Sequence, residues 1–494
     1  MTVSEKAAQQ QTPRVSSGER VWNEARWVSL SVCPVLLAAV VFVLARDELS
    51  DDALISLSYG RTLGLHGWWG MQPGVAANSQ TSPLNALVLG GITALVRSVI
   101  IAAGLVWCGS VSMVTVFVDR LAARLGGSWW AGPAAGSLVA CSPLMVATIG
   151  LETALVMGLV TGLAWAVVMR GPATVGALCG LLALARPDAV VFGLLAVVLV
   201  GRSWWRAAGV AAAVAAPWLV WSWWALGSAV PDTLLLKAGG VWPEPVGYGD
   251  HIVMFTMANG PLLYVMQHPS AALLTAAAVT LGLTGLVVLA RTPGPGGRAA
   301  VLLGGGAAGY YTTMLALDPG PYVWYFGPSV MAVALAGMLG LAGVRGGGVL
   351  AGGLVAMTAC LTLTSTPTVP ESGNFASSAQ YSAVASHLPS GPITVPGEIG
   401  ALTFYCDGRC ITVGNAFSER AAVVGAIRAK VDAMPGLVGM LARANFARLA
   451  MPPQIPAPVR LVNTADVDQP GALAWWPIST VWRGPMRMVL LPAT

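Results

Sequence analysis

The sequence predicts an α-helical, polytopic membrane protein with a small C-terminal α/β domain. Of its 494 residues, 56% are hydrophobic and only 10% are charged, and the mean hydropathy is +0.71. A soluble protein has about a quarter of its residues charged, so most of this chain must be surrounded by lipid. The net charge of +5 is small, and no basic patch with interleaved aromatic residues occurs, which argues against a nucleic-acid partner.

The N-terminal residues 1–26 form a polar tail. They contain Lys6, Arg14, Arg20 and Arg26, and the apolar run that follows has no small-residue cleavage site after a short core. A cleaved signal peptide is therefore not predicted. We expect a cytoplasmic tail followed by a retained first span.

Eleven apolar segments within residues 27–365 approach the roughly 20 residues that a helix needs to cross a bilayer. They are residues 27–45, 99–118, 130–148, 153–169, 173–185, 189–201, 207–228, 270–290, 299–317, 325–344 and 348–365. The fifth and sixth are short and share the polar break Arg186-Pro187-Asp188. The apolar run 84–96 is too short to span, so we expect it to lie along the surface or to re-enter the membrane.

Positive charge sets the predicted orientation. With the N-terminus inside, every inner loop is basic, and these loops contain Arg120, Arg124, Arg170, Arg202, Arg206, Arg291, Arg298 and Arg345. Cytoplasmic loops of membrane proteins carry such an excess of Lys and Arg. We therefore expect a multi-pass protein of the cell membrane. An odd number of spans would place the C-terminal segment outside the cytoplasm.

The composition changes to that of a soluble domain at about residue 366, so residues 366–494 are predicted to form an extracytoplasmic α/β domain. The segment "PITVPGEIGALTFYCDGRCITVG" predicts strands joined by a turn. The segment "SERAAVVGAIRAKVDAM" predicts a helix capped by Ser418. A three-residue hairpin loop would place Cys406 opposite Cys410, within disulfide reach. A metal site is the alternative, but no further Cys or His is adjacent.

Ionisable residues gather on the predicted outer face. The stretch "ARDELSDDALISLSYGR" follows the first span and contains Asp47, Glu48, Asp51 and Asp52. An ordinary hydrated loop would explain this cluster if it stood alone. The same face also carries Glu152, Arg186, Asp188 and Lys237. Charged groups at membrane depth are costly, which makes them candidates for function.

This combination of groups suits glycosyl transfer from a lipid phosphate. A carboxylate can remove a proton from an acceptor hydroxyl. Cations can hold an anionic phosphate leaving group at the lipid boundary. A sugar carried on a lipid phosphate would supply that phosphate.

The sequence resembles GT-C glycosyltransferases that use polyprenyl-phosphate sugars. It is most similar to the actinobacterial, mycobacterial-type terminal arabinofuranosyltransferases. The matching pieces, in order, are Asp51-Asp52, Tyr59 with Arg61, His66-Gly67, Pro73-Gly74, Thr81-Ser82-Pro83-Leu84, "GLET" at 150–153, "ARPD" at 185–188, "GSAVPDTLLLKAG" at 227–239 and "GEIGALTFYCDGR" at 397–409. Asn78 and Asp232 depart from the family, which often has an acidic residue and an Asn at these two positions.

The resemblance implies a GT-C fold of about 11 transmembrane helices, with a catalytic first outer loop at residues 46–98. It implies that Asp51 is the base and that Asp52 supports it or helps to hold a divalent cation, Mg or Mn. Glu152 would shape the acceptor or metal site, and Lys237, Arg186 and Arg61 would bind the donor phosphate. The remaining candidate substrate-binding residues are His66, Asn78, Thr81, Asp188, Asp232, Trp324 and Tyr325.

The implied reaction is an inverting transfer of arabinofuranose from decaprenyl phosphate. The acceptor would be a cell-wall polysaccharide such as arabinogalactan, or a lipoglycan such as lipoarabinomannan. A mannosyltransferase using polyprenyl-phosphate mannose is one alternative. A lipid or sugar transporter, such as a flippase, is another, but we find no internal symmetry of the kind common in transporters. An inactive scaffold is a third, and the retained charges argue against it.

Some candidates have simpler interpretations. His66 could be an ordinary turn residue. Trp324 and Tyr325 could belong to an aromatic belt at the membrane interface.

Overall fold

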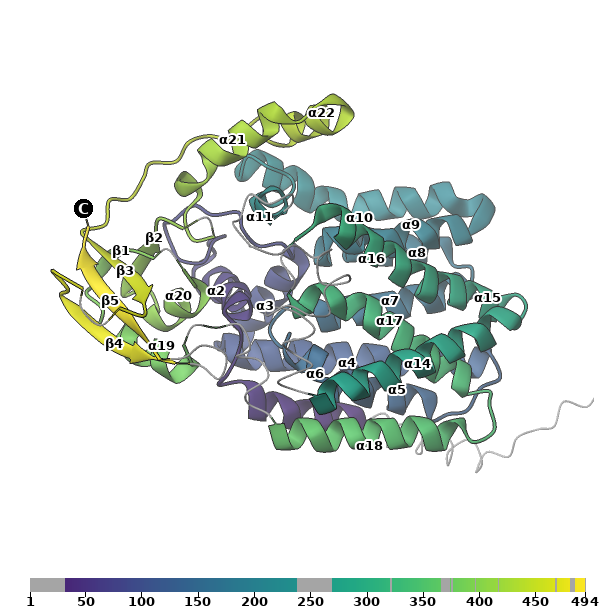
Figure 1. The fold of residues 1–494 in the computed structure, drawn as a ribbon. Coiled ribbons are helices and arrows are strands. Elements are labelled where there is room, and N and C mark those ends of the chain that lie inside the picture. The colour runs from purple at the N-terminus through teal and green to yellow at the C-terminus, as the bar shows by residue number, and fades with distance from the viewer. Residues whose placement is uncertain are drawn as a thin grey trace, which may run out of the picture.

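The computed structural model describes residues 32–237, 269–319, 322–365 and most of 374–493. It consists of a large bundle of helices with a small β-sheet at one end (Figure 1). The end of the bundle that carries the sheet is called the sheet side below. The predicted N-terminal tail lies outside the described residues.

Each of the eleven predicted spans contains helical structure. The segments are Val32–Ala45, α4 (Val99–Arg124), α5 (Ala131–Cys141) with α6 (Pro143–Val146), α7 (Thr153–Val168), α8 (Pro172–Ala185), α9 (Val190–Leu199), α10 (Trp204–Ala225), α14 (Pro269–Arg291), α15 (Pro295–Ala300) continuing through a π-helical turn, Val301–Gly305, into α16 (Gly306–Leu317), α17 (Val323–Leu341) and α18 (Gly347–Ser365). Six helices in the described part of the chain are long and apolar enough to cross a membrane. The protein is therefore a multi-pass membrane protein, and the total of eleven spans stays a prediction.

The predicted span 130–148 is not one continuous helix. Helix α5 ends at Cys141, and α6 starts at Pro143 after an extended residue, Ser142. Proline lacks an N–H group and clashes with the preceding turn, so a helix breaks at this position.

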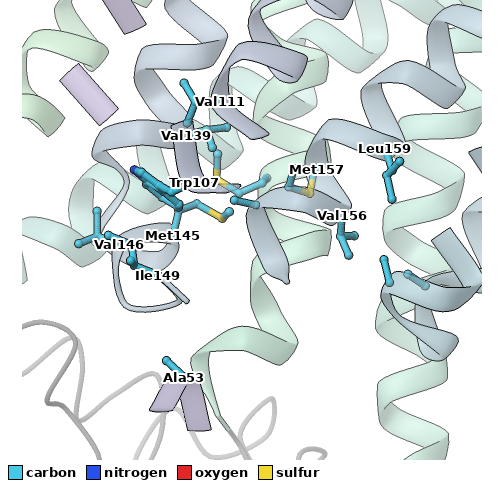
Figure 2. Packing of buried hydrophobic residues seen from close by; sticks show 14 of the residues in the cluster. Ala53, Trp107, Val111, Val139, Met145, Val146, Ile149, Val156, Met157 and Leu159 are labelled. Atoms are coloured by element: carbon cyan, nitrogen blue, oxygen red, sulfur yellow. The ribbon is translucent and has the colours of Figure 1, made fainter. Parts of the chain in front are cut away.

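The core of the bundle lies between α4, α5, α6 and α7. Trp107 of α4 packs in one buried cluster with Met145 of α6 and Met157 of α7 (Figure 2). The indole Nε1 of Trp107 donates a hydrogen bond of 3.1 Å to the carbonyl of Ala38, which ties the first helix to α4. Side chains buried on this scale make the bundle a rigid support for the sheet side.

The segment 46–98, predicted as a loop, is largely helical. Helix α2 (Asp51–His66) starts after Ser50, whose hydroxyl accepts a hydrogen bond from the amide of Ala53, and ends at Gly67, which has a φ of 65°. Helix α3 (Pro83–Val96) is the short apolar helix expected at 84–96, and it packs against α2. A serine N-cap and a left-handed glycine after the last turn are both standard helix ends.

The C-terminal sheet has five strands in the order β2-β1-β3-β5-β4. Their bounds are β1 Gly391–Thr394, β2 Cys410–Val413, β3 Val459–Thr464, β4 Ala474–Ile478 and β5 Met486–Pro492. Strand β1 runs parallel to β2 and β3, and β5 is antiparallel to β3 and β4. Two helices, α19 (Ser378–His387) and α20 (Gly400–Cys406), lie beside the sheet (Figure 1).

The predicted hairpin around Cys406 and Cys410 is wrong. The segment "GALTFYC" forms α20, which connects the parallel strands β1 and β2, because parallel neighbours need a crossover rather than a tight turn. The two cysteines are nevertheless joined by a disulfide. Asp407 and Gly408 turn the chain between them with left-handed φ values of 48° and 78°.

The helix predicted to start at Ser418 begins later. Helix α21 (Val424–Ala433) follows a short 3-10 turn, and the Ser418 hydroxyl donates to the carbonyl of Asn415 instead of capping a helix. Helix α22 (Gly436–Asn445) comes directly after α21. A further short helix, α11 (Asp232–Lys237), lies between the helix bundle and this region.

Candidate active site

A cavity opens on the sheet side, where α2, the start of α7, the α8–α9 turn, α11 and the facing ends of α16 and α17 meet. Its polar lining consists of Asp52, Ser56, Ser79, Gln80, Thr81, Glu152, Arg186, Asp188 and Thr233. Its apolar lining includes Met314, Leu317, Trp324, Tyr325 and Phe417. The cavity therefore joins an ionisable wall to an aromatic wall at the end of membrane helices.

A buried ion cluster forms one wall of this cavity. The guanidinium of Arg186 lies 3.0 Å from Oε1 of Glu152 and 2.9 Å from Oδ1 of Asp188, and the Arg186 and Glu152 side chains are 5% and 7% exposed. Tyr310 donates to Asp188 at 3.3 Å, and the Tyr325 ring lies 5.2 Å from the Arg186 guanidinium carbon. Burial alone lowers the pKa of Arg186, but the carboxylates hold it well above its usual value. Arg186 is thus charged and fixed in place.

The charge balance of this cluster limits what it can bind. Two carboxylates face one guanidinium, so the cluster has no excess positive charge when both are ionised. An anion in the cavity would need a further cation. Thr233 and Leu234 of α11 line the cavity, and Lys237 ends that helix. The Lys237 side chain lies outside the described part of the structure.

The two aspartates at the start of α2 have different surroundings. Asp52 lines the cavity, whereas Asp51 does not. The Oδ1 atom of Asp51 accepts a hydrogen bond of 2.8 Å from the amide of Ala401, at the start of α20. A Cβ atom on Gly400 would lie 2.0 Å from the Asp51 carbonyl oxygen, so α20 can approach α2 this closely only with glycine there. Asp51 therefore joins α2 to the C-terminal region.

The environment of Asp51 predicts a pH-dependent stability. Burial raises its pKa to about 7, with a smaller raising effect from Asp52, although the Ala401 amide opposes the shift. Because the folded pKa exceeds the unfolded one, the folded state binds more protons, and stability falls as the pH rises from about 4 to about 7. We expect Asp51→Asn to flatten this part of the profile. Apparent unfolding temperatures in detergent across that range would check it, and an unchanged slope in the variant would contradict it.

Gln80 is a cavity residue that sequence reasoning missed. Its side chain is 3% exposed, and its Nε2 group has no hydrogen-bond partner among the described residues. A buried amide donor without a partner is costly, which suggests that a ligand accepts from it. The signal in the sequence was the polar run "NSQTS" at 78–82, of which only Asn78 and Thr81 were predicted as binding residues.

Four predicted binding residues, Arg61, His66, Asn78 and Asp232, lie away from the cavity lining, and Asp232 is described in the next paragraph. Arg61 lies 2.8 Å from Oδ1 of Asp407 and donates to the carbonyl of Phe404 at 2.9 Å. Burial lowers the pKa of Arg61, and Asp407 counters this effect. His66 is exposed in the last turn of α2. Asn78 is buried and bonds to Ser228 outside the cavity. Arg61 thus connects the end of α20 to α2 and is not placed to bind a phosphate in the cavity.

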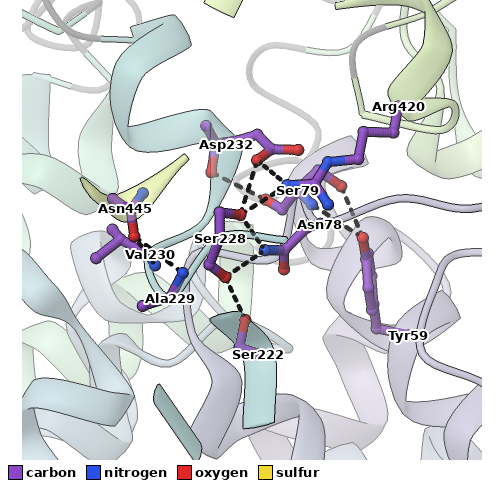
Figure 3. Close-up of polar contacts among 11 residues, drawn as sticks. Tyr59, Asn78, Ser79, Ser222, Ser228, Ala229, Val230, Asp232, Arg420 and Asn445 are labelled. Carbon is purple, nitrogen blue, oxygen red and sulfur yellow. Dashed lines mark hydrogen bonds and ion pairs between the residues drawn. The ribbon is translucent and has the colours of Figure 1, made fainter. Parts of the chain in front are cut away.

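Asp232 belongs to a buried polar network that joins the C-terminal region to the bundle (Figure 3). Arg420 reaches Asp232 Oδ1 at 2.7 Å and the Ser228 hydroxyl at 2.6 Å, and Asn78 donates to the same hydroxyl at 3.0 Å. The Arg420 and Asp232 side chains are 7% and 2% exposed. Burial raises the pKa of Asp232, and Arg420 counters that shift. Nothing in the sequence linked Arg420 to Asp232, because 188 positions separate them.

The described residues do not assemble a metal centre. No group of three or more His, Cys, Asp or Glu side chains in the described part of the chain lies close enough to hold an ion. The cation considered for Asp51 and Asp52 would also compete with the Ala401 amide for Oδ1 of Asp51. A divalent cation at Asp51 and Asp52 stays an untested prediction.

Solved structures with a similar architecture are known. ArnT from Cupriavidus metallidurans superposes with a TM-score of 0.57 at 12% identity in its apo state, covering 94% of this chain and 98% of that one. The chain has the GT-C fold. The same enzyme bound to undecaprenyl phosphate matches with the same TM-score at 13% identity over the same shares of both chains. Arabinofuranosyltransferase AftD from Mycobacteria matches at 14% identity with a TM-score of 0.46, covering 96% of this chain and 40% of that one. No protein-family model and no curated protein matches the sequence.

Proposed function

We propose that the protein is a membrane glycosyltransferase that moves a sugar from a polyprenyl-phosphate donor to an acceptor hydroxyl. The observation that carries the proposal is the composition of the cavity described above. It combines the Asp52 carboxylate, the Gln80 amide, the fixed charge of Arg186 and the aromatic rings of Trp324 and Tyr325, and within the described residues the Gln80 Nε2 group has no hydrogen-bond partner. These groups stand where membrane helices end, so a lipid-linked substrate can reach them.

The ArnT structure with undecaprenyl phosphate supports a polyprenyl-phosphate lipid as the donor, because it has this fold. In our proposal the donor phosphate lies between Arg186 and α11, where Lys237 supplies the further positive charge that the ion cluster lacks. The prenyl chain leaves the cavity past Met314 and Leu317, near the end of α16. The sheet side then faces away from the cytoplasm, in agreement with the basic loops at the opposite end.

The proposed step is a single displacement. Asp52 accepts the proton of the acceptor hydroxyl as its oxygen forms a bond to the anomeric carbon. The bond from that carbon to the phosphate oxygen breaks, and polyprenyl phosphate leaves with its charge stabilised by the cations. Attack opposite the leaving group inverts the anomeric centre. Asp51, one residue earlier, holds α2 against α20 instead of acting as the base.

Arabinofuranose remains the proposed sugar, with a cell-wall polysaccharide or lipoglycan as the acceptor. This choice rests on the sequence resemblance, because the fold alone does not determine the sugar. Mannose from a polyprenyl phosphate is the second candidate.

Transfer by the purified protein tests the proposal. The protein would receive decaprenyl-phosphate arabinose, and separately polyprenyl-phosphate mannose, each with a short oligosaccharide acceptor. We expect an elongated acceptor with the arabinose donor only. Elongation with the mannose donor would overturn the assignment of arabinofuranose but would support the proposed reaction. If neither donor supports transfer and the protein instead moves lipid across the vesicle membrane, the assignment as an enzyme is overturned in favour of a transporter.

Gln80 provides a narrower prediction. We expect Gln80→Leu to lower kcat/KM by roughly 5- to 150-fold, which corresponds to about 1–3 kcal/mol for a lost hydrogen bond to a polar or charged ligand group. Gln72→Leu is the matched control. Gln72 is also a buried amide, but it bonds the backbone of Thr412 at 2.5 and 3.1 Å and does not line the cavity. Wild-type kinetics in Gln80→Leu would show that the amide does not contact substrate.

A further inference from the structure

Helix α22 presents an apolar face to the surroundings. Leu437, Val438, Met440 and Leu441 are 65%, 66%, 55% and 58% exposed. At 100° per residue these four positions form one continuous stripe along the helix. Large contiguous apolar patches of this kind mark contacts with another protein or with a membrane.

The opposite face of α22 is already packed. Gly439 is buried, and a Cβ atom there would lie 1.9 Å from the carbonyl oxygen of Met434, at the end of α21. Ala442 and Phe446 pack against a small apolar cluster that includes Ile427 of α21. The orientation of α22 is therefore fixed, and its apolar stripe must face away from the protein.

Polar contacts fix the end of α22 at a membrane helix. The indole Nε1 of Trp223, in the last turns of α10, donates to the carbonyl of Ala444 at 3.0 Å. Oδ1 of Asn445 accepts from the amides of Ala229 and Val230 at 2.9 and 3.0 Å. The Arg448 guanidinium lies 5.3 Å from the centre of the Trp223 ring. Figure 1 shows α22 beside α10, at the end nearer the sheet.

The part of α10 beside this contact faces lipid. Helix α10 belongs to one of the candidate membrane spans. Near its sheet-side end, Val220, Trp221 and Trp224 are 64%, 41% and 66% exposed. Tryptophan is enriched where membrane helices meet the interface. The apolar stripe of α22 thus continues the lipid-facing surface of α10.

We propose that α22 is an interfacial helix whose apolar stripe is inserted into the leaflet on the sheet side. An amphipathic helix at a membrane surface places its apolar face among the acyl chains. The contact would also support the cavity. Lys430 of α21 donates to the carbonyl of Leu235 in α11 at 2.8 Å, and the neighbouring residue Leu234 lines the cavity. A lipid-anchored α22 therefore holds α21 against one wall of the site.

Fluorescence from a single label tests this proposal on the full-length protein in nanodiscs. Cys33 and Cys360, the exposed free cysteines, are replaced by serine, and an environment-sensitive dye is attached to Leu441→Cys. His387→Cys is the matched control, because His387 is also exposed in the C-terminal half of a helix, α19, but lies beside the sheet. The nanodiscs are prepared with and without phospholipids that carry a nitroxide quencher on the acyl chain.

We expect the dye at position 441 to emit at shorter wavelength than the dye at 387, and the nitroxide lipid to reduce its intensity. Equal, water-like emission at both positions would overturn the proposal. A blue-shifted but unquenched dye at 441 would also overturn it, because it would show that protein, such as a second copy, covers the stripe. Leu437→Ser in the labelled protein should weaken the quenching if the stripe inserts, and unchanged quenching would contradict insertion.

Discussion

We expect Asp52→Asn to lower the rate of the proposed sugar transfer by about 10²–10⁴-fold, the usual contribution of a positioned general base. Asparagine has nearly the size of aspartate, and Asp52 lines the cavity. The lost activity would therefore reflect the missing proton acceptor and not a change in packing. We expect Asp51→Asn to keep most of the activity at neutral pH, because an amide oxygen can still accept from the Ala401 amide. Initial rates with saturating donor would measure both variants, with folding checked by size-exclusion chromatography.

The opposite result would be informative. Full activity in Asp52→Asn, with activity lost in Asp51→Asn, would return the role of base to Asp51. That outcome would require α20 to release Asp51 during the reaction. Loss in both variants, with normal folding, would indicate that the pair acts as a unit.

Arg420→Ala is expected to have the largest effect on stability. It leaves Asp232 buried without its cation, and breaking a buried ion pair from one side costs about 3–5 kcal/mol. The pKa of Asp232 is already raised by burial, and it would rise further. Stability of the variant should therefore fall as the pH rises, since folding must take up a proton. Apparent unfolding temperature and protease sensitivity of residues 376–493 are the measurements.

The double variant Arg420→Met with Asp232→Asn is the matched control. It removes both charges, so no isolated ion stays buried, and it should recover much of the lost stability. An unfolding temperature equal to wild type in Arg420→Ala alone would show that the network does not hold the C-terminal region. Equal destabilisation in the single and double variants would assign the effect to packing.

Much of the fold could be predicted because membrane helices leave a strong signal in hydropathy. Each apolar run became helical, and the polar break at Arg186 and Asp188 falls at a real turn. The fold of the C-terminal region was harder to predict from the sequence. The alternation around "GALTFYC" resembled a strand, and a Cα–Cα distance of 5.3 Å between Cys406 and Cys410 is reached by a helix followed by a turn as well as by a hairpin.

The candidate site likewise contains some features that the sequence predicts and others that only the tertiary structure reveals. The sequence placed Glu152, Arg186 and Asp188 on the same predicted face of the membrane, and in the structure they form one ion cluster. It could not decide between Asp51 and Asp52, because neighbouring residues on a helix point about 100° apart. Only the start of α2 at Ser50 and the approach of α20 settle which aspartate lines the cavity. The pairing of Arg420 with Asp232 likewise depends on tertiary contacts.

The central claim is that the cavity between Asp52, Gln80 and Arg186 binds the phosphate of a lipid-linked sugar donor. An experimental structure of the wild-type protein in lipid with decaprenyl phosphate tests it most directly. Our account predicts that the phosphate lies in this cavity, within hydrogen-bond distance of Gln80, Arg186 or Lys237, with the prenyl chain leaving past Leu317. A phosphate bound outside these lining residues, with the cavity closed to it, would contradict the account.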